Sequence, residues 1–492
     1  MATLDEQDFP TESERKRVAK RVSRRLDRIA ILREEIAQLT RENTKDRFYI
    51  ATHRLLPREV LGEVFLHAAI QCSGTWLAPV VISHVSRHWR DVINSTPRAW
   101  SHICIRIIPN SSYSQIVKTW LELSGHSPLH LRFETPHWGT GTSLGSYLAL
   151  LQPHVSRWYS VEIFIGEAPH HTIWNIQLLL QQFNFDMPAL RSFYLDTTRQ
   201  LWQDYRVLGG VVPMLKHLNI GHCRPGLTNH WLSHLEALEI THAIHSLYYM
   251  HGLLQACPLL TSLKLDVVIQ EREMRGWSVV ELPKLRNLFL NDIIYLSFLR
   301  LPNLSSFTFS KKPVTCLQEG HKLFSSLSIM LEMSHNTIFQ DLSLVDVDIS
   351  RFNITTTDFP SFSNLHLTRC TIRPDALTHH DQTSVWASLN TLEFNSCDQI
   401  PDALIDLFIE DNTWVGSLRR LSFSDCFGVG PDLVARVLAC KMCPQVAYSA
   451  STRTSPRQIT SARSGPSNRL PVFFPAPTPV TLPPPPLPRT SS

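Results

Sequence analysis

The sequence has no stretch that approaches the roughly 20 consecutive apolar residues of a membrane-spanning helix. It also lacks a strong charge of one sign, because 47 basic and 43 acidic side chains leave a formal net charge of +4. No global field therefore attracts nucleic acid. The first fifteen residues carry five acidic side chains and no apolar run, so we expect no secretory signal. These absences predict a soluble intracellular protein, cytoplasmic or nuclear, with no membrane or nucleic-acid partner.

Motifs of known chemistry are absent as well. The sequence contains no Gly-rich phosphate loop, no G-x-S-x-G elbow and no H-E-x-x-H helix. Cys440-Lys441-Met442-Cys443 is a lone C-x-x-C without a second pair at zinc spacing, and His170-His171 and His379-His380-Asp381 are isolated. The ten cysteines are scattered singly, which indicates reduced, mostly buried thiols. We therefore expect a protein that is not an enzyme, with no catalytic residues, no cofactor and no metal.

The sequence does contain a recurring hexad: an apolar residue, two others, an apolar residue, one other and an apolar residue. The ten copies are Leu190-Phe193-Leu195, Leu215-Leu218-Ile220, Leu235-Leu238-Ile240, Leu260-Leu263-Leu265, Leu285-Leu288-Leu290, Leu304-Phe307-Phe309, Phe339-Leu342-Leu344, Phe362-Leu365-Leu367, Leu389-Leu392-Phe394 and Leu418-Leu421-Phe423. Weaker echoes lie at Leu129-Leu131 and at Val161-Ile163.

The spacing of these hexads is informative. Their starting positions differ by 19 to 35 residues, around the roughly 20 to 29 residues of a leucine-rich repeat. One copy would be weak evidence, because any half-buried strand alternates in this way. Repetition predicts an α/β leucine-rich-repeat solenoid whose strands line a concave side. Positions between the leucines, such as Asn219, Glu239, Lys264, Glu393 and Ser422, would then line that side as a protein-binding surface or as ordinary solvated strand residues.

A second signature follows several hexads. Cys223, Cys370, Cys397 and Cys426 each lie three residues after the last apolar position. A small thiol can fill the inside of a turn without bringing a strong donor into the core. The later copies continue into segments that begin at Pro374, Pro401 and Pro431, and proline followed by Asp is typical of a helix start. We therefore expect units of strand, Cys turn and helix.

Residues 11–50 are charged and have a helical pattern. Apolar residues at heptad positions a and d are Val18, Val22, Ile29, Leu32, Ile36 and Leu39, and Arg25 interrupts them. Because only about three heptads are present, a short coiled coil and a plain solvated helix are both compatible with the pattern. The basic residues between 14 and 28 could serve nuclear import or phosphate binding, or could simply form a solvent-exposed helix face.

Two amphipathic segments precede the repeats. In the run from Leu55 to Leu66, Pro57 suits the first helical position, and Val60, Leu61, Val64 and Phe65 would form one apolar face. After a linker around Ser73-Gly74, the pattern predicts one helix over 79–93 that stacks four apolar residues on one side. Those four are Val81, Val85, Trp89 and Val92.

These segments resemble the F-box family in their Leu-Pro-x-Glu-Val-Leu opening, their Val-Ser-Arg-His-Trp-Arg-Asp-Val helix and a trailing Thr-Pro-Arg-Ala-Trp. The resemblance covers about 55 residues. It implies a small helical domain that docks the Skp-type adaptor of a cullin ubiquitin ligase. The contacts to the adaptor that it implies are Leu56, Pro57, Val60, Leu61, Val64 and Phe65, while Trp89 and Val92 would pack internally. The alternative is a set of helices that only cap the solenoid.

We thus divide the chain into six parts. They are a disordered start (1–10), a helix or short coiled coil (11–50), an all-α F-box-like domain (51–108), atypical leading repeats (109–185), leucine-rich repeats (186–447) and a disordered Pro/Ser-rich tail (448–492). The tail could also occupy an SH3-type groove. The expected function is substrate recognition in an SCF-type ubiquitin ligase, with an unknown target protein bound by the repeats. The alternative is a leucine-rich interaction scaffold without a ligase role.

Overall fold

The structure is a computed structural model of the full chain. It describes residues 11–50, 56–71, 77–107, 114–135, 144–166, 183, 185–197, 208, 210–221, 230–269, 278–310, 320–336, 338–347, 362–371, 389–397, 400, 418–426, 429 and 445–449. Calls on 1–10, on Cys223, on the segments from Pro374, Pro401 and Pro431, and on the tail beyond 449 lie outside these residues.

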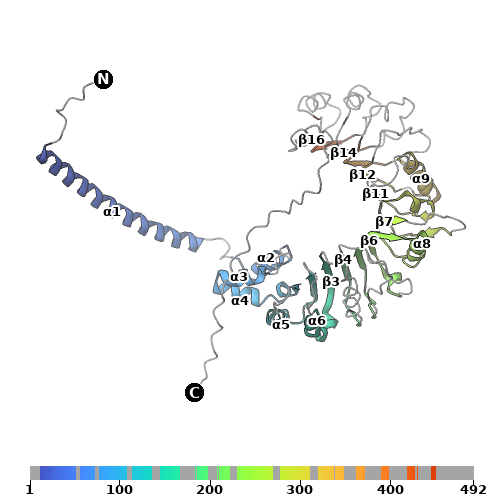
Figure 1. Ribbon diagram of the computed structural model, residues 1–492, viewed down its shortest axis with the longest axis horizontal. Coiled ribbons are helices and arrows are strands. Elements are labelled where there is room, and N and C mark those ends of the chain that lie inside the picture. Colours follow the sequence, from blue (N-terminus) through green and yellow to red (C-terminus); the bar gives the residue numbers. More distant parts are fainter. Residues whose placement is uncertain are drawn as a thin grey trace, which may run out of the picture.

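The N-terminal helix α1 (Glu12–Ile50) confirms the helix predicted over 11–50. Thr11 caps it, because the Glu14 amide donates to the Thr11 hydroxyl (3.4 Å) and the Thr11 amide donates to the Glu14 carboxylate (2.8 Å). All described side chains of α1 are exposed to solvent. Figure 1 shows α1 projecting away from the rest of the molecule.

A small helical module follows, comprising α2 (Arg58–Gln71), α3 (Ala78–Val85), α4 (Arg87–Asn94) and the 3-10 helix η2 (Pro97–Trp100). The single helix predicted over 79–93 is wrong, because the chain breaks at Ser86. Ser86 is extended (φ −159°, ψ 166°) and its hydroxyl accepts a hydrogen bond from the Trp89 amide, which starts a new helix. Gly62 lets α2 approach Thr96 closely, since a Cβ at position 62 would lie 3.0 Å from the Thr96 hydroxyl.

Within the described ranges, fourteen strands form one sheet in which every neighbouring pair is parallel. They are β1 (His102–Arg106), β2 (Leu129–Thr135), β3 (Trp158–Ile165), β4 (Ser192–Thr197), β5 (His217–Gly221), β6 (Ala237–His245), β7 (Ser262–Ile269), β9 (Asn287–Leu290), β11 (Ser306–Ser310), β12 (Asp341–Val345), β13 (Asn364–Thr368), β14 (Thr391–Asn395), β15 (Arg420–Ser424) and β16 (Gln445–Ser449). Each strand pairs with the next one along the chain within this sheet. This order is that of a repeat array and is compatible with a solenoid.

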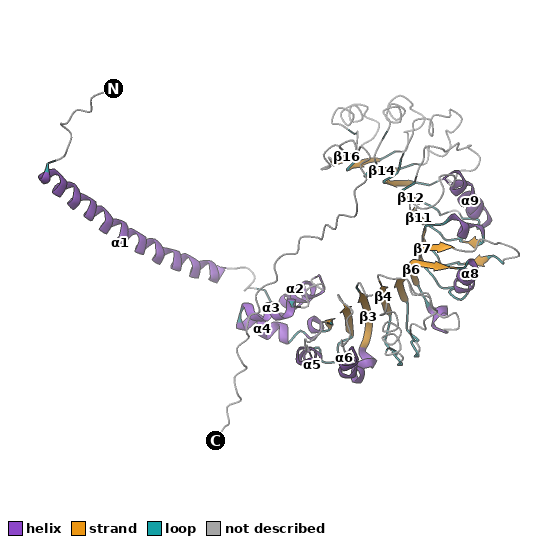
Figure 2. Ribbon diagram, viewed as in Figure 1, coloured by secondary structure: helices purple, strands orange, loops and turns teal. Residues whose placement is uncertain are grey.

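The sheet curves into an arc with its strands on the inner side, and the described helices of the repeats lie on the outer side (Figures 1 and 2). Those outer elements are α5 (Ser114–Leu123), α6 (Leu144–Leu151), η3 (Gln152–Arg157), η5 (His230–His234), α8 (Leu247–Gln255), η6 (Ile293–Ser297) and α9 (Gly320–Met333). The short strands β8 (Val280–Glu281) and β10 (Leu299–Arg300) pair with each other.

All ten hexads form neighbouring strands of this sheet, as predicted. In each hexad the first apolar residue precedes the strand and the other two lie within it. All thirty of these side chains are buried, with at most 8% of their surface exposed. The echoes at Leu129-Leu131 and Val161-Ile163 are confirmed as β2 and β3. The core is therefore one continuous layer between the sheet and the outer elements.

The sheet also extends beyond the boundaries predicted for it. β1 lies inside the segment assigned to the helical domain (51–108), and β16 passes the predicted end of the repeats at 447. Trp100, Ile103 and Ile105 repeat the hexad spacing, with tryptophan in place of leucine at the first position. The large aromatic residue fills the same buried site, with 4% of its surface exposed. The helical module thus ends near Ser101.

Cysteine turns follow the later strands, as predicted. Cys370 and Cys397 are fully buried, and their thiols donate to the carbonyls of Leu344 (3.3 Å) and Leu367 (3.4 Å) one repeat earlier. Burial raises the pKa of the Cys370 thiol to about 11, so this thiol is neutral near pH 7. These cysteines are packing residues.

Among the described helices, none combines the length and the apolar character that crossing a bilayer requires.

Candidate interaction surfaces

The inner face of the sheet carries one continuous row of side chains. Strand alternation buries the hexad residues, so the residue between the last two apolar positions points to the inside of the arc. Parallel register places these residues side by side across the sheet. This inner row comprises Cys104, Arg132, Glu162, Tyr194, Asn219, Glu239, Lys264, Phe289, Thr308, Ser343, His366, Glu393 and Ser422. It includes all five positions that the sequence had suggested for the concave side.

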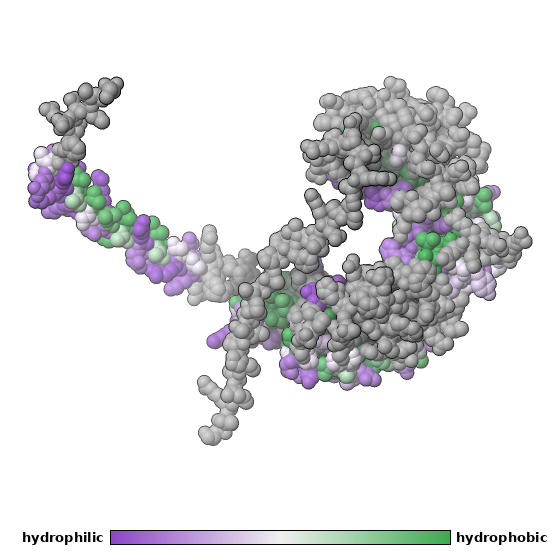
Figure 3. Space-filling view, viewed as in Figure 1, coloured by the Kyte–Doolittle hydropathy of each residue, from purple (hydrophilic) through white to green (hydrophobic). Residues whose placement is uncertain are grey.

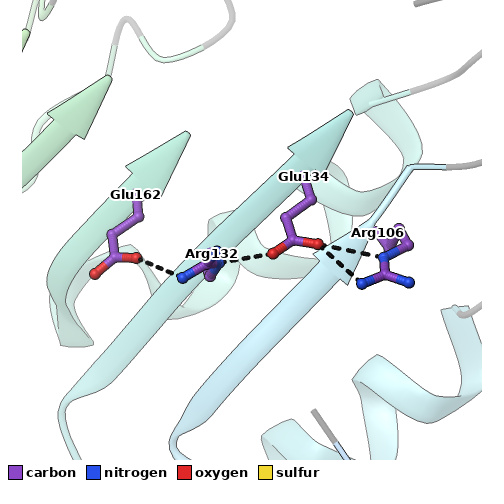
Figure 4. A network of polar contacts seen from close by, with 4 residues as sticks. All are labelled: Arg106, Arg132, Glu134 and Glu162. Carbon is purple, nitrogen blue, oxygen red and sulfur yellow. Dashed lines mark hydrogen bonds and ion pairs between the residues drawn. The ribbon is translucent and has the colours of Figure 1, made fainter. Parts of the chain in front are cut away.

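Near its first strands, the inner row belongs to a ladder of ion pairs (Figure 4). Glu134 lies between two arginines, with Arg132 Nε at 2.8 Å and Arg106 Nε at 3.2 Å from its carboxylate oxygens. Arg132 continues to Glu162 (3.6 Å), and its guanidinium also lies 4.1 Å from the Phe164 ring centroid. The side chains of Glu134 and Arg132 are only 17% and 29% exposed. Mutual pairing therefore holds these charges in fixed positions on the sheet.

The middle of the row has a second polar cluster. Asn219 donates to Glu239 (2.6 Å), Lys264 pairs with the same carboxylate, and the Lys264 ammonium lies 5.5 Å from the Phe289 ring centroid. The next two positions, Thr308 and Ser343, are small and uncharged. A polar region of fixed geometry thus gives way to a less charged stretch of the same face.

A third cluster lies on the later strands. His366 Nδ1 is 2.9 Å from Glu393, and Arg420 Nε is 3.4 Å from the other oxygen of that carboxylate. Beside them Asn364 donates to Asp341 (2.5 Å). Mixed positive, negative and neutral groups along the inner face fit a protein surface better than a single anion.

A pair of histidines lies at the start of the sheet. The rings of His102 and His130 stack, with centroids 4.3 Å apart and planes 3° from parallel. Burial, with the neighbouring His102 as a second cause, lowers the pKa of His130 to about 4. Burial also lowers the pKa of His102. Both rings are therefore neutral near pH 7, and they pack together rather than repel.

The helical module presents a different kind of surface. On α2, Val60 and Val64 are 46% and 50% exposed, whereas Leu61 and Phe65 are each 2% exposed. The prediction that these four residues form one apolar face is wrong, because adjacent positions on a helix point about 100° apart. Leu61 and Phe65 pack into the core that continues under the sheet. They are therefore not available for contact with another protein.

The remaining predicted contact residues lie at the start of α2. Pro57 is exposed and directly precedes the helix, and its carbonyl accepts a hydrogen bond from the Leu61 amide (3.0 Å). Pro57 therefore lies directly before the first helical position, whereas the sequence pattern had placed it at that position. Leu56 is half-buried against the core. Pro57, Val60 and Val64 thus remain at the surface.

A second exposed apolar row, which the sequence pattern predicted only in part, lies on α3 and the residue before it. Leu77, Val81 and Val85 are 43%, 60% and 57% exposed and lie one helical turn apart. The predicted helix over 79–93 had joined Val81 and Val85 with Trp89 and Val92. Val92 is buried, and Trp89 is half-buried with its ring centroid 4.9 Å from that of Phe65. The predicted internal packing of Trp89 and Val92 is confirmed.

Comparison with known proteins assigns no family. No family model matches this chain, and no curated protein matches it. Among solved structures, the crystal structure of a protein from Bacteroides fragilis matches with a TM-score of 0.26 and 11% sequence identity. The match covers 68% of this chain and 78% of that protein.

In the part of the chain that the structure describes, no group of three His, Cys, Asp or Glu residues could hold a metal ion. Cys440, Cys443 and the histidine pairs at 170 and 379 lie outside that part. No local sequence motif marked the ion-pair ladder, because Arg106 and Glu134 are 28 residues apart. The strand register brings them together.

Proposed function

We propose that this chain is a substrate-recognition subunit of an SCF-type ubiquitin ligase. The helical module (residues 56–101) would be an F-box that docks a Skp-type adaptor, and the sheet would be a leucine-rich-repeat solenoid that binds the target protein. The observation that carries the proposal is the pairing of two surfaces: exposed valines on α2 and α3, and a long inner row of mainly polar side chains on the sheet.

The exposed valines support docking because a helix that only covered the end of the sheet would need one apolar face. α2 buries Leu61 and Phe65 against the core and still exposes Val60 and Val64 on another side. α3 likewise buries Ile82 and exposes Val81 and Val85. Apolar side chains that gather at the surface mark candidate protein-protein contacts, whereas single exposed ones are ordinary. The proposed adaptor contacts are Pro57, Val60 and Val64, with Leu56 at their edge.

The mechanism proposed for this chain is proximity. A target held beside a charged conjugating enzyme has a raised local concentration, so this chain itself would perform no chemistry and would require no cofactor. The inner row would supply target contacts through its fixed charges and its central Phe289, Thr308 and Ser343. We place this function in the cytoplasm or the nucleus, where cullin ligases act.

The second candidate is a leucine-rich interaction scaffold without a ligase role. It is favoured by the burial of Leu61, Phe65 and Trp100 in the same core as the strands, which makes the helical module a cap for β1. The two candidates differ in whether the exposed valines bind an adaptor.

The test is co-purification of a Skp-type adaptor with the full-length chain carrying Val60→Glu and Val64→Glu. We expect at least a tenfold loss of adaptor binding with unchanged thermal unfolding, because charges on an exposed helix face disrupt docking but not the core. The matched control is Ile329→Glu with Met333→Glu, an exposed i, i+4 pair on α9 (56% and 51% exposed). It should bind as the unsubstituted chain does. Adaptor binding that survives Val60→Glu and Val64→Glu, or is absent from the unsubstituted chain, would favour the scaffold.

A further inference from the structure

Helix α1 carries an apolar row that the described part of the chain leaves in water. Its residues are Val18, Val22, Ile29, Leu32, Ile36 and Leu39, with exposed fractions between 40% and 63%. Figure 3 shows apolar residues in green along α1 between polar ones in purple. The row keeps the 3.5-residue spacing of a coiled-coil seam, with Val22, Ile29 and Ile36 at a and Val18, Leu32 and Leu39 at d.

We propose that α1 pairs with α1 of a second copy of this chain as an antiparallel coiled coil. This inference goes beyond the proposed function and does not depend on it. In an antiparallel pair each a residue faces a d residue of the other helix. One alignment places Ile29 opposite the partner's Leu32 and Val22 opposite the partner's Leu39. Its centre falls between residues 30 and 31, the middle of α1 (Glu12–Ile50), so nearly the whole helix is paired.

Charges beside the seam select this alignment. The g positions along α1 carry Arg21 and Arg28 in the first half and Glu35 and Glu42 in the second half. In an antiparallel pair g faces g, so Arg21 meets the partner's Glu42 and Arg28 meets the partner's Glu35. Two-fold symmetry makes four such pairs. Each brings opposite charges together, which favours this arrangement over its competitors.

The polar residues within the seam agree with this arrangement. Arg15 at an a position faces the partner's Asp46 at d, so opposite charges meet at each end of the coil. Arg25 faces the partner's Ile36, where its aliphatic stem can cover the isoleucine while the guanidinium reaches water. The pairs Arg41 with Glu34 (3.1 Å) and Lys16 with Glu12 (2.8 Å) form within one helix. Both members of the first pair are at f, on the side away from the seam.

A parallel pair would bring like charges together. Arg25 would face Arg25 and Arg15 would face Arg15 in the seam, and Arg28 would lie beside the partner's Arg33. Two features favour the parallel form: asparagines at Asn43 can pair with each other at a, and Glu42 at g would lie beside the partner's Arg47 at e. Three kinds of arginine contact oppose it, and two of them lie inside the seam. Antiparallel packing also places the positive N-terminal end of each helix dipole beside the negative C-terminal end of the other.

The first test measures the mass of the full-length chain in solution by analytical ultracentrifugation over a range of concentrations. The unsubstituted chain should reach twice the mass of one chain. Arg21→Glu with Arg28→Glu, and separately Glu35→Arg with Glu42→Arg, should each weaken association at least tenfold, because like charges then meet at g. An equimolar mixture of the two variants should restore the dimer.

The control for the first variant is Lys20→Glu with Arg24→Glu, which makes the same change in charge at f and c, away from the seam. It should dimerise as the unsubstituted chain does. In a parallel pair, Arg28→Glu would attract the partner's Arg33 and would therefore strengthen association. A chain that stays monomeric at all concentrations, or a charge variant that dimerises more tightly, would overturn the proposal.

The second test reads the orientation directly. Val22 and Leu39 are separated by seventeen residues along α1, about 25 Å. Under mild oxidation, a mixture of Val22→Cys and Leu39→Cys chains should form a cross-linked dimer, and neither variant alone should do so, because a disulfide spans less than about 7 Å between Cα atoms. The unsubstituted chain, treated in the same way, controls for its own cysteines. Cross-linking by each variant alone would show a parallel pair.

Discussion

At the scale of single residues, burial separates neighbours that look equivalent in the sequence. Val60 and Leu61 are adjacent and apolar, yet they are 46% and 2% exposed. The helical period alone shows that they point in different directions. It does not show which direction meets the core, because that depends on α4 and η2 packing against α2.

Leu61→Ala should therefore destabilise the protein by about 2 to 5 kcal/mol, because it leaves a cavity in the core. Val60→Ala should change the free energy of unfolding by less than about 0.5 kcal/mol. Chemical denaturation of both variants measures the difference. Equal effects would mean that α2 packs with another face toward the sheet.

The pair of stacked histidines predicts a pH effect. The pKa of His130 is lowered to about 4 in the folded chain, against about 6.5 when unfolded. The unfolded state therefore binds the proton more tightly. Stability present above pH 6.5 is lost as the pH falls from about 6.5 toward 4.

In denaturation at pH 7.5 and pH 5.0, the unsubstituted chain should lose more stability on acidification than His130→Gln does. His126→Gln, at an exposed histidine, should keep the full pH dependence. An unchanged pH dependence in His130→Gln would contradict the burial of this ring.

At the scale of elements, the turns after the later strands share one backbone conformation. Asp346, Arg369, Ser396 and Asp425 all have positive φ, between 51° and 57°. The amides of Arg369 and Ser396 donate to carbonyls of the following strand's residues Asn395 and Ser424, both at 2.8 Å. This conformation turns the chain away from the sheet while hydrogen bonding continues to the next repeat.

Because L-residues are strained at positive φ, Ser396→Gly should stabilise the protein by up to about 1 kcal/mol. Ser396→Val should destabilise it by about 1 to 3 kcal/mol, since a branched Cβ fits this conformation poorly. The control is Ser343→Gly within β12, which should destabilise by about 0.5 to 1 kcal/mol. Midpoints of urea unfolding provide the comparison, and a destabilising Ser396→Gly would argue against the turn.

At the scale of the whole molecule, the helical module and the sheet share one core. Trp100 packs edge-on against Trp120 of α5, with centroids 5.3 Å apart, and its indole N–H donates to the Ile93 carbonyl (2.9 Å). The module therefore covers the first edge of the sheet. Helix α1, by contrast, has exposed side chains throughout its described length.

Deletion of residues 1–50 should accordingly leave the unfolding midpoint of the sheet unchanged. Deletion of residues 1–101 should lower its stability by more than about 3 kcal/mol or prevent folding, because it uncovers Ile103 and Ile105 and removes Trp100. Thermal unfolding of the two truncated chains measures this. A stable chain 102–492 would mean that the module folds independently of the sheet.

Much of the fold could be predicted from the sequence because its signals are local. The alternation within each hexad marks a strand and its buried residues, and ten copies at similar spacing mark neighbours in a repeat array. The heptad spacing in α1 is equally local. β1 escaped prediction because Trp100 replaces the leucine of its hexad.

Other features arise only in three dimensions. Packing decided that Leu61 and Phe65 point inward, the Ser86 cap divided one expected helix into α3 and α4, and strand register brought Arg106, Glu134 and Arg132 together. Spacing along the chain sets the direction in which each side chain points from its own backbone. What lies in that direction depends on contacts between segments that are distant in the sequence, so only the tertiary structure determines it.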